Sequence, residues 1–148
     1  MNSELKRAET LYEAVNQLIR VHQFRDRESI CCHNVSVAQC YALETLVKLG
    51  PLRLKSLADE MCLDKSTASR VVDALLRKGY ALKTLDPLDQ RAVQLSLTSE
   101  GHELYATIRK TLIDEEASMI ADISPEVVDA ALVLLGKLTV AARARLGT

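Results

Sequence analysis

Apolar residues recur with helical spacing in the middle of the chain, between residues 65 and 78. They lie on one face of a helix and are Ala68, Val71, Val72, Leu75 and Leu76. Asp64 precedes this segment as a suitable N-cap, and Gly79 follows it where a left-handed residue commonly ends a helix. The pattern predicts an amphipathic helix over residues 65–78.

A shorter segment with the same periodicity comes immediately before that helix. Its apolar positions share one side and are Leu54, Leu57, Ala58 and Met61. Only Cys62 and Leu63 separate the two segments, so we expect a tight turn in which Cys62 packs. Two short helices joined in this way predict a helix-turn-helix, whose second helix can lie in a DNA major groove. The exposed side of that second helix carries short hydroxyls and cations, which suit hydrogen bonds to base edges and phosphates. The candidate DNA-binding residues on it are Lys65, Ser66, Thr67, Ser69, Arg70 and Arg77.

After Gly79 the hydrophobic period changes from about 3.6 residues to two. Apolar residues alternate with polar ones over residues 93–97, as in a half-buried strand, and residues 80–85 can pair with that strand. The link over residues 86–91 is polar and contains Pro87, which predicts a hairpin tip. Arg91 in this tip is a further candidate DNA contact, because narrow minor grooves attract Arg.

These segments together resemble the MarR family of bacterial winged-helix regulators. The resemblance is carried by residues 57–72, Lys78-Gly79, residues 86–93 and residues 97–101. It implies an obligate homodimer, usually a repressor, whose affinity for DNA changes with a small ligand or with thiol chemistry. It also implies that Ser66, Thr67, Ser69 and Arg70 face the major groove and that Arg91 faces the minor groove. The chain departs from the family pattern at Gln90, where many members carry a second Arg, and in a less basic wing strand at residues 83–85.

The flanking segments read as helices that build a dimer. Caps are expected at Ser36 and Thr98, and Ser124-Pro125-Glu126 combines a capping hydroxyl, Pro at the first helical position and an acid in the first turn. The last helix is apolar over a wide arc, which favours pairing with a second copy about a two-fold axis. The alternative is that the flanking helices only close the core of one chain. The acidic run over residues 114–116 is expected to be a solvated helix face.

The sequence thus predicts a mainly α fold in a single MarR-like domain over residues 1–148. Residues 36–98 form the winged helix-turn-helix lobe, and residues 1–35 and 99–148 form the helical dimerisation region. The expected partners are a second copy and duplex DNA that carries an inverted repeat, with half-sites about 10 bp apart.

Composition and charge permit this function without demanding it. With 48% hydrophobic residues and few Gly or Pro, the chain is globular, and its apolar runs are too short to span a bilayer. With an N-terminus unlike a signal peptide, we expect a cytoplasmic protein. Residues 53–91 hold 8 Lys/Arg against 6 Asp/Glu, whereas the remainder holds 11 against 14. An enzyme is not expected, because phosphate-loop, metalloprotease and nucleophile-elbow motifs are absent from the sequence. A winged helix used as a protein-interaction module is the alternative.

Three thiols and an imidazole fall within ten residues of each other, at Cys31, Cys32, His33 and Cys40. Thiolates select thiophilic metals or metalloids, and they are also oxidisable, so this set is a candidate sensing site. Inert packing is the alternative, because free Cys is often buried. A different effector is a small aromatic or phenolic acid bound between helices by Tyr12, Tyr41 or Arg20. The protein is expected to need no cofactor beyond such a metal or metalloid.

Overall fold

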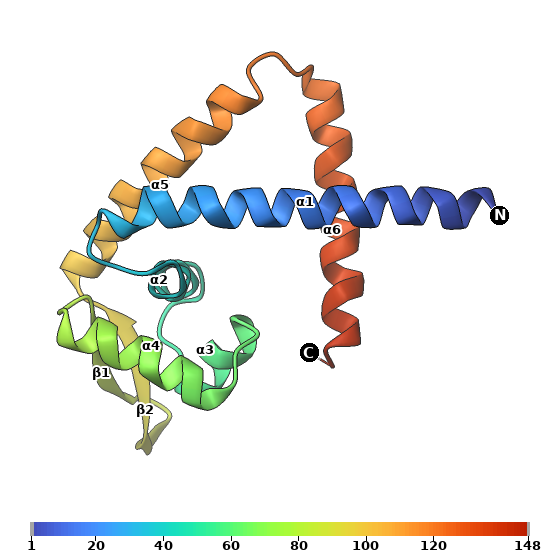
Figure 1. Cartoon of the computed structure of the whole chain (residues 1–148). Helices are drawn as coiled ribbons and strands as arrows, with labels where there is room; N and C mark the ends of the chain where they lie inside the picture. The colour runs from blue at the N-terminus through green and yellow to red at the C-terminus, as the bar shows by residue number, and fades with distance from the viewer. Residues whose placement is uncertain (1, 148) are drawn as a thin grey trace.

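The structure is a computed structural model that describes residues 2–147, and of Cys31 it describes the backbone alone. It is mainly helical with one antiparallel hairpin (Figure 1). The elements in chain order are α1 (Ser3–Cys31), α2 (Val37–Leu49), α3 (Leu54–Glu60), α4 (Lys65–Arg77), β1 (Ala81–Asp86), β2 (Asp89–Leu97), α5 (Ser99–Met119) and α6 (Pro125–Arg145). The predicted helix-turn-helix is therefore α3 and α4, and we call the hairpin β1–β2 the wing.

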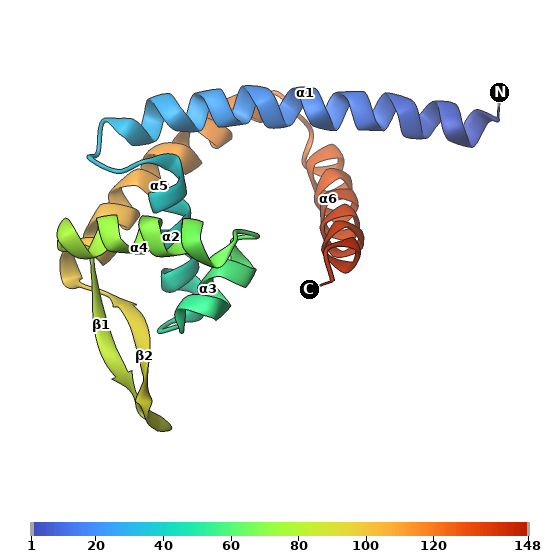
Figure 2. The ribbon, with the colours of Figure 1, turned by 60° about the horizontal axis from the view of Figure 1, so that its bottom comes forward.

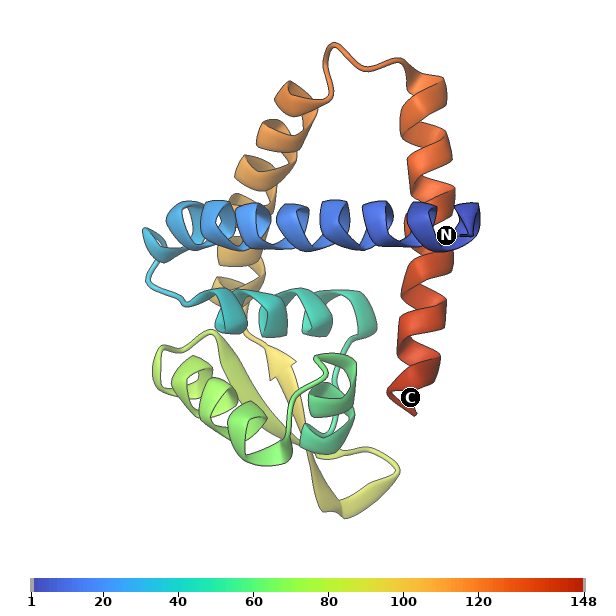
Figure 3. The same ribbon diagram turned by 45° about the vertical axis from the view of Figure 1, so that its right-hand side comes forward.

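Helix α2 lies at the centre of the lobe, and Figure 3 shows it between α1 and the helix-turn-helix. One buried cluster joins it to α1, α4, β1 and α5 through Ile30, Val35, Cys40, Ala42, Leu43, Leu75, Ala81, Tyr105 and Ile108. A second cluster joins it to α3, α4 and β2 through Leu46, Leu57, Val72 and Leu95. Because α2 contributes to both clusters, the recognition helix α4 is packed against a helix that also contacts α1 and α5.

Local sequence signals set most of the helix boundaries. The Asp64 side chain accepts a hydrogen bond from the backbone N–H of Thr67, and Ser36 forms a capping box with Gln39. Gly79 has φ +80° and ends α4, as predicted. Ser124 does precede α6, but its hydroxyl makes no capping bond within the described residues; its carbonyl oxygen accepts instead, from the backbone N–H of Val127.

The predicted hairpin tip is longer than the turn that the structure contains. Strand β2 begins at Asp89, so Pro87 and Leu88 alone form the turn, and Arg91 lies within the strand. The Asp86 side chain accepts a hydrogen bond from the backbone N–H of Leu88 at 2.8 Å, which stabilises this tight connection. The prediction of a loop over residues 86–91 was wrong, because the hydrogen bond between Leu88 and Asp86 closes the turn within two residues and β2 already begins at Asp89.

The N-terminal half of α1 and the whole of α6 extend away from the lobe (Figure 1). None of the residues of α6, all of which lie in the described part of the chain, is buried. The large apolar side chains that these two helices leave exposed are Leu5, Tyr12, Leu18, Ile19, Val21, Phe24, Val127, Leu132, Val133, Leu134, Leu135 and Val140. Over residues 2–147, a helix both long enough and apolar enough to cross a membrane is not found.

Candidate nucleic-acid interface

The first two turns of α4 present the candidate major-groove residues on the surface of the lobe. Lys65, Ser66 and Arg70 are exposed, and Thr67 and Ser69 are half-buried. The carboxylate of Asp64 accepts hydrogen bonds from the Ser66 hydroxyl at 2.7 Å and from the Thr67 hydroxyl at 2.9 Å. These bonds, with the Thr67 backbone N–H, lower the pKa of Asp64 to about 2.

The same bonds determine which hydrogen-bonding roles remain for the two hydroxyls. Each hydroxyl uses its one proton on Asp64, so its oxygen lone pairs are left to accept. The Arg70 guanidinium already donates to Thr67 Oγ1 at 3.3 Å. In this arrangement Ser66 and Thr67 suit donors on base edges, whereas phosphate oxygens need Arg70, Lys65 or backbone N–H groups.

The remaining candidates on α4, Ser69 and Arg77, have other surroundings. Ser69 lines a hollow of about 190 Å³ between α4 and the wing, together with Leu54, Val72, Asp73, Lys83, Val93 and Leu95. Arg77 is exposed at the other end of α4, seven residues and about 10 Å along the helix axis from Arg70. The structure therefore brings Lys65, Ser66, Thr67 and Arg70 together and leaves Arg77 apart from them.

An ion pair between α3 and the wing fixes the hairpin beside α4. Arg53, the residue before α3, donates to Asp86 Oδ2 from Nε at 3.0 Å and from Nη2 at 2.7 Å. Asp86 is only 6% exposed, and hydrogen bonds from the Leu88 backbone N–H and from Arg53 lower its pKa. Sequence reasoning missed this pair, because the two residues are 33 positions apart and local patterns do not join them.

Arg91 extends from the wing into solvent. Its side chain is 95% exposed, and its backbone N–H donates to Asp89 Oδ1 at 3.1 Å. The wing projects from the lobe beyond α4 (Figure 2). A cationic side chain on a projecting hairpin suits an adjacent DNA groove.

The cysteines of the candidate sensing site occupy different environments. Cys40 is 2% exposed in the core, and burial raises the pKa of its thiol to about 12. Cys32 is exposed, and its Sγ lies 3.4 Å from the Ser29 carbonyl oxygen. The side chain of Cys31 lies outside the described residues, and His33 is half-buried. Within the described part, the structure contains no group of three or more His, Cys, Asp or Glu that could hold a metal ion.

Cys62 departs from its expected place. It is exposed rather than packed, because the turn places it at φ +55°, between the ends of α3 and α4. The backbone N–H of the next residue, Leu63, bonds to the carbonyl oxygen of Ala58.

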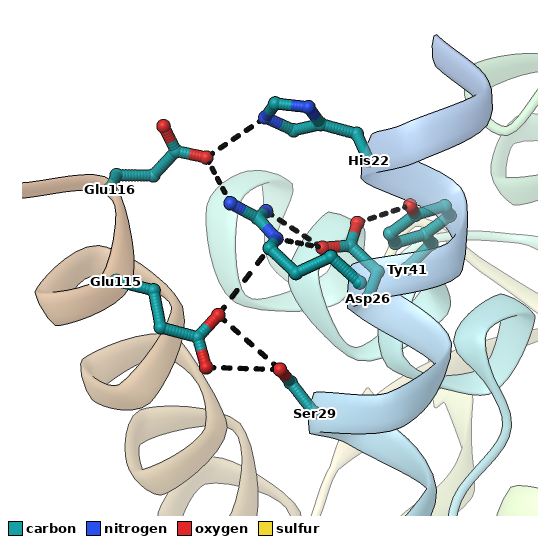
Figure 4. A network of polar contacts seen from close by, with 7 residues as sticks. His22, Asp26, Ser29, Tyr41, Glu115 and Glu116 are labelled. Atoms are coloured by element: carbon teal, nitrogen blue, oxygen red, sulfur yellow. Dashed lines mark hydrogen bonds and ion pairs between the residues drawn. The ribbon is translucent and has the colours of Figure 1, made fainter. Parts of the chain in front are cut away.

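A polar network joins α1, α2 and α5 (Figure 4). The Arg25 guanidinium donates to Asp26 Oδ1 and to Glu116, and Tyr41 donates its hydroxyl proton to Asp26 Oδ2 at 2.9 Å. Burial and the bond to Asp26 raise the pKa of Tyr41 to about 12.

The α5 carboxylates complete this network. His22 Nε2 lies 3.0 Å from Glu116 Oε1, and the Ser29 hydroxyl donates to Glu115 Oε1 at 3.0 Å. The expectation of a solvated acidic face is therefore wrong for Glu115 and Glu116, since α1 supplies partners for both. It fits Asp114, which is exposed and pairs with Lys110.

Tyr41 also lines two adjoining surface hollows at the start of α2. One, of about 590 Å³, is lined by Gln23, Arg27, Ser36, Val37, Ala38 and Tyr41. The other, of about 250 Å³, is lined by Ala38, Tyr41, Glu44, Thr45, Glu60, Met61 and Leu63. Tyr12 and Arg20 line a separate hollow farther along α1, so the structure does not bring them to Tyr41. Arg27, which sequence reasoning missed, is the cation beside Tyr41.

Comparisons with known proteins agree with this architecture. The sequence matches the MarR family profile over residues 35–93. It is 28% identical to the uncharacterized HTH-type transcriptional regulator YkoM of Bacillus subtilis, over 90% of this chain and 87% of that protein. It is 30% identical to the HTH-type transcriptional repressor MdtR of the same organism, over 64% of this chain and 63% of that protein. Among solved structures, a MarR-family transcriptional regulator from Silicibacter pomeroyi superposes with a TM-score of 0.72 at 25% identity, over 84% of each chain.

The helix-turn-helix followed by a two-stranded wing defines a winged-helix protein of the DNA-binding class. The chain belongs to the MarR family of transcriptional regulators. The predicted family and mainly α fold are thereby confirmed. Its relatives are transcriptional regulators and not enzymes.

Proposed function

We propose that this regulator acts as a homodimer that binds an inverted repeat in duplex DNA through α4 and the wing of each copy. The observation that carries the proposal lies in the first two turns of α4, where hydroxyl oxygens and the Arg70 guanidinium lie together on the surface beside a wing that extends Arg91. This combination supplies acceptors for base edges and cations for phosphates and for the minor groove.

Dimerisation is proposed from the apolar surface that α1 and α6 expose. Both helices expose many large apolar side chains, which is typical of a subunit interface, and homodimers usually bury such surfaces about a two-fold axis. In the described part of the chain, α6 has an ion pair between Arg143 and Glu60 at 3.8 Å, but no buried residue. A second copy would cover this surface. Two α4 helices related by the axis would then meet major grooves about 34 Å apart.

Substitution of Arg70 and Arg91 tests the proposed DNA surface. We expect Arg70→Ala and Arg91→Ala each to abolish tight binding to a duplex selected by the wild-type protein, measured at matched salt. Arg109→Ala, which removes an exposed Arg from α5, is the matched control and should leave affinity unchanged. Each lost phosphate contact should also reduce the salt slope of log K by about 0.9.

Three results would contradict the proposal. Retention of wild-type affinity by both Arg70→Ala and Arg91→Ala would show that the DNA surface lies elsewhere on the lobe. A chain that sediments as a monomer at the concentrations where it binds DNA would remove the dimer. If the wild-type chain enriched no duplex and captured a protein instead, the alternative role of a winged-helix interaction module would replace this one.

We propose a repressor role, since MdtR, a relative that matches 64% of this chain, is named a repressor. A reporter gene placed behind the selected duplex tests this role in cells. Expression should fall when the wild-type chain is present and recover with Arg70→Ala. A rise in expression with the wild-type chain would identify an activator instead.

For the effector we propose a small aromatic anion bound at the start of α2. Arg27 and Tyr41 line the larger hollow with apolar side chains of Val37 and Ala38, which suits a ring that carries a negative charge. Tyr41 also donates to Asp26 in the α1–α5 network, so a ligand that competes for the Tyr41 hydroxyl would disturb the helix junction. Salicylate is a suitable probe, and Arg27→Ala should weaken its effect on DNA release.

The alternative effector is a thiophilic metal, a metalloid or an oxidant acting at Cys31, Cys32, Cys40 and His33. Of the two cysteine side chains of this set that the structure describes, Cys32 is exposed, and buried Cys40 would have to move to meet it. Arsenite, Zn(II) and peroxide should be added separately to the DNA complex of wild type and of Cys31→Ser, Cys32→Ser and Cys40→Ser. Release that depends on these cysteines would support the thiol signal, and release unchanged in all three variants would exclude it.

A further inference from the structure

The tip of the wing presents an apolar side chain that the fold does not use. Leu88 is 96% exposed, the largest value among the exposed large hydrophobic residues that the structure describes. Turns usually carry small or polar residues, since an apolar side chain there gains nothing from burial. Leu88 is therefore available to a partner outside the lobe.

The turn holds Leu88 in place before any partner arrives. The backbone N–H of Leu88 donates to Asp86 Oδ1 at 2.8 Å, and the other oxygen of Asp86 accepts from Arg53 at 2.7 and 3.0 Å. Pro87 restricts the backbone torsion immediately before Leu88. The side chain therefore extends from a preorganised tip, and binding it loses little conformational freedom.

The charges around the tip permit an approach to DNA. The carboxylates of Asp86 and Asp89 would repel phosphates if they were unpaired. Asp86 is paired with Arg53, and Asp89 lies 3.5 Å from Arg91 Nε and 4.0 Å from Arg53 Nη2. The tip thus combines an apolar end with the exposed guanidinium of Arg91 three residues away.

We propose that Leu88 enters the DNA minor groove beside Arg91 and contributes to sequence preference there. The inference rests on the proposed function, because it requires the wing to lie on duplex DNA. The minor groove is about 6 Å wide, and apolar side chains such as Leu do insert into it in other DNA-binding proteins. Guanine projects its 2-amino group into that groove, and a Leu side chain can neither accept a hydrogen bond from this group nor share its space. Leu88 should therefore favour A·T over G·C pairs at the position under the tip.

Inosine separates this effect from major-groove recognition. An I·C pair keeps the major-groove groups of G·C but lacks the 2-amino group in the minor groove. The probes are duplexes enriched from a random pool by the wild-type protein, with the wing position located by footprinting. Each is then made with A·T, G·C or I·C at that position. The proteins are wild type, Leu88→Ala and, as the matched control, Leu85→Ala, which removes another exposed Leu from the same hairpin.

We expect wild type to bind the A·T and I·C duplexes alike and the G·C duplex about tenfold more weakly, the usual scale for one mismatched pair. Leu88→Ala should bind the A·T duplex about tenfold more weakly than wild type and show almost no G·C penalty. Leu85→Ala should keep the wild-type profile. The salt slope of Leu88→Ala should equal that of wild type, because Leu88 contacts no phosphate.

Three outcomes overturn the inference, and they are distinguishable. If Leu88→Ala keeps wild-type affinity and the full G·C penalty while Arg70→Ala loses binding, Leu88 has no role and the proposed function stands. If the wild-type protein enriches no duplex, the proposed function fails and the inference fails with it. A G·C penalty that I·C shares would place the discrimination in the major groove and would also overturn the inference.

Discussion

Gly101→Ala should destabilise the protein, although alanine is normally the better helix residue. Gly101 lies in the first turn of α5, and a Cβ added there would be 2.1 Å from the carbonyl oxygen of Tyr80. To reach even 3.0 Å, the closest separation that real Cβ atoms tolerate, α5 and the backbone of Tyr80 must part by 0.9 Å. That shift strains the bonds from Thr98 N to Tyr80 O, at 3.1 Å, and from Thr98 Oγ1 to Gly79 O, at 2.7 Å.

The size of the loss follows from three opposing contributions. Overpacking costs about 1–3 kcal/mol, each weakened hydrogen bond costs about 0.5–1.5 kcal/mol, and the helix preference for Ala returns about 0.5–1 kcal/mol. With two weakened bonds, the net expectation is a loss of about 3 kcal/mol in the free energy of unfolding, or about 1.5 M in the urea midpoint for a slope of about 2 kcal/mol per M.

Circular dichroism during urea unfolding measures this loss, at one fixed protein concentration because association would contribute to stability. Ala106→Gly at an exposed position of α5 is the control, since it measures the helix preference of the same helix without a close approach. It should cost only about 0.5–1 kcal/mol. A Gly101→Ala protein as stable as wild type would refute the close approach of α5 to Tyr80.

Three further predictions concern the ion pair of the wing, the helix junction and the core thiol. Arg53→Ala should loosen the wing and weaken DNA binding. Because the pKa of Asp86 is lowered in the folded state, the stability that this pair adds is present at neutral pH and is lost as pH falls below about 4. The urea midpoints of the variant and the wild type should therefore converge in acid. Tyr41→Phe should cost about 1 kcal/mol by removing the donor to Asp26. Since the pKa of Tyr41 is raised to about 12, the stability that its hydroxyl adds is complete below the usual pKa of 10.0 and is lost as pH rises toward 12. The difference between the ultraviolet titration curves of wild type and variant reports the ionisation of Tyr41. Cys40, with its pKa raised to about 12, should resist iodoacetamide in the native protein, whereas the exposed Cys32 and Cys62 should react. Mass spectrometry of labelled native and urea-unfolded samples measures this difference. Rapid labelling of Cys40 in the native protein would contradict its burial.

Elements marked by local patterns were predictable from the sequence. Helix α4 begins after Asp64 and ends before Gly79 because a capping carboxylate and a left-handed glycine act within a few residues of the boundary. The pairing of β1 with β2 followed from alternation, and the error in the tip came from one side-chain bond of Asp86. The first turn of α4 was predicted as a site, but the bonds that orient its hydroxyls toward Asp64 were not.

Contacts between distant segments were not predictable in the same way. Arg53 and Asp86 are 33 residues apart, and Arg25 and Glu116 are 91 residues apart. A charged residue on a helix usually faces solvent, so the acidic run of α5 gave no sign that α1 would supply its partners. The cysteines show the converse limit. Their closeness in sequence suggested a common site, whereas the loop between α1 and α2 places Cys32 at the surface and Cys40 in the core.

Helix α2 provides the physical link between the proposed effector site and the proposed DNA surface. At its start, Tyr41 lines the hollow and donates to Asp26 of α1. Two and five residues later, Leu43 and Leu46 enter the two core clusters, which also contain Leu75 and Val72 of α4. Packed interiors do not deform continuously, so a ligand that displaced Tyr41 would shift α2 as a body and carry α4 with it. Because two α4 helices must meet grooves about 34 Å apart at once, a small shift in each copy would suffice to break the match with the duplex.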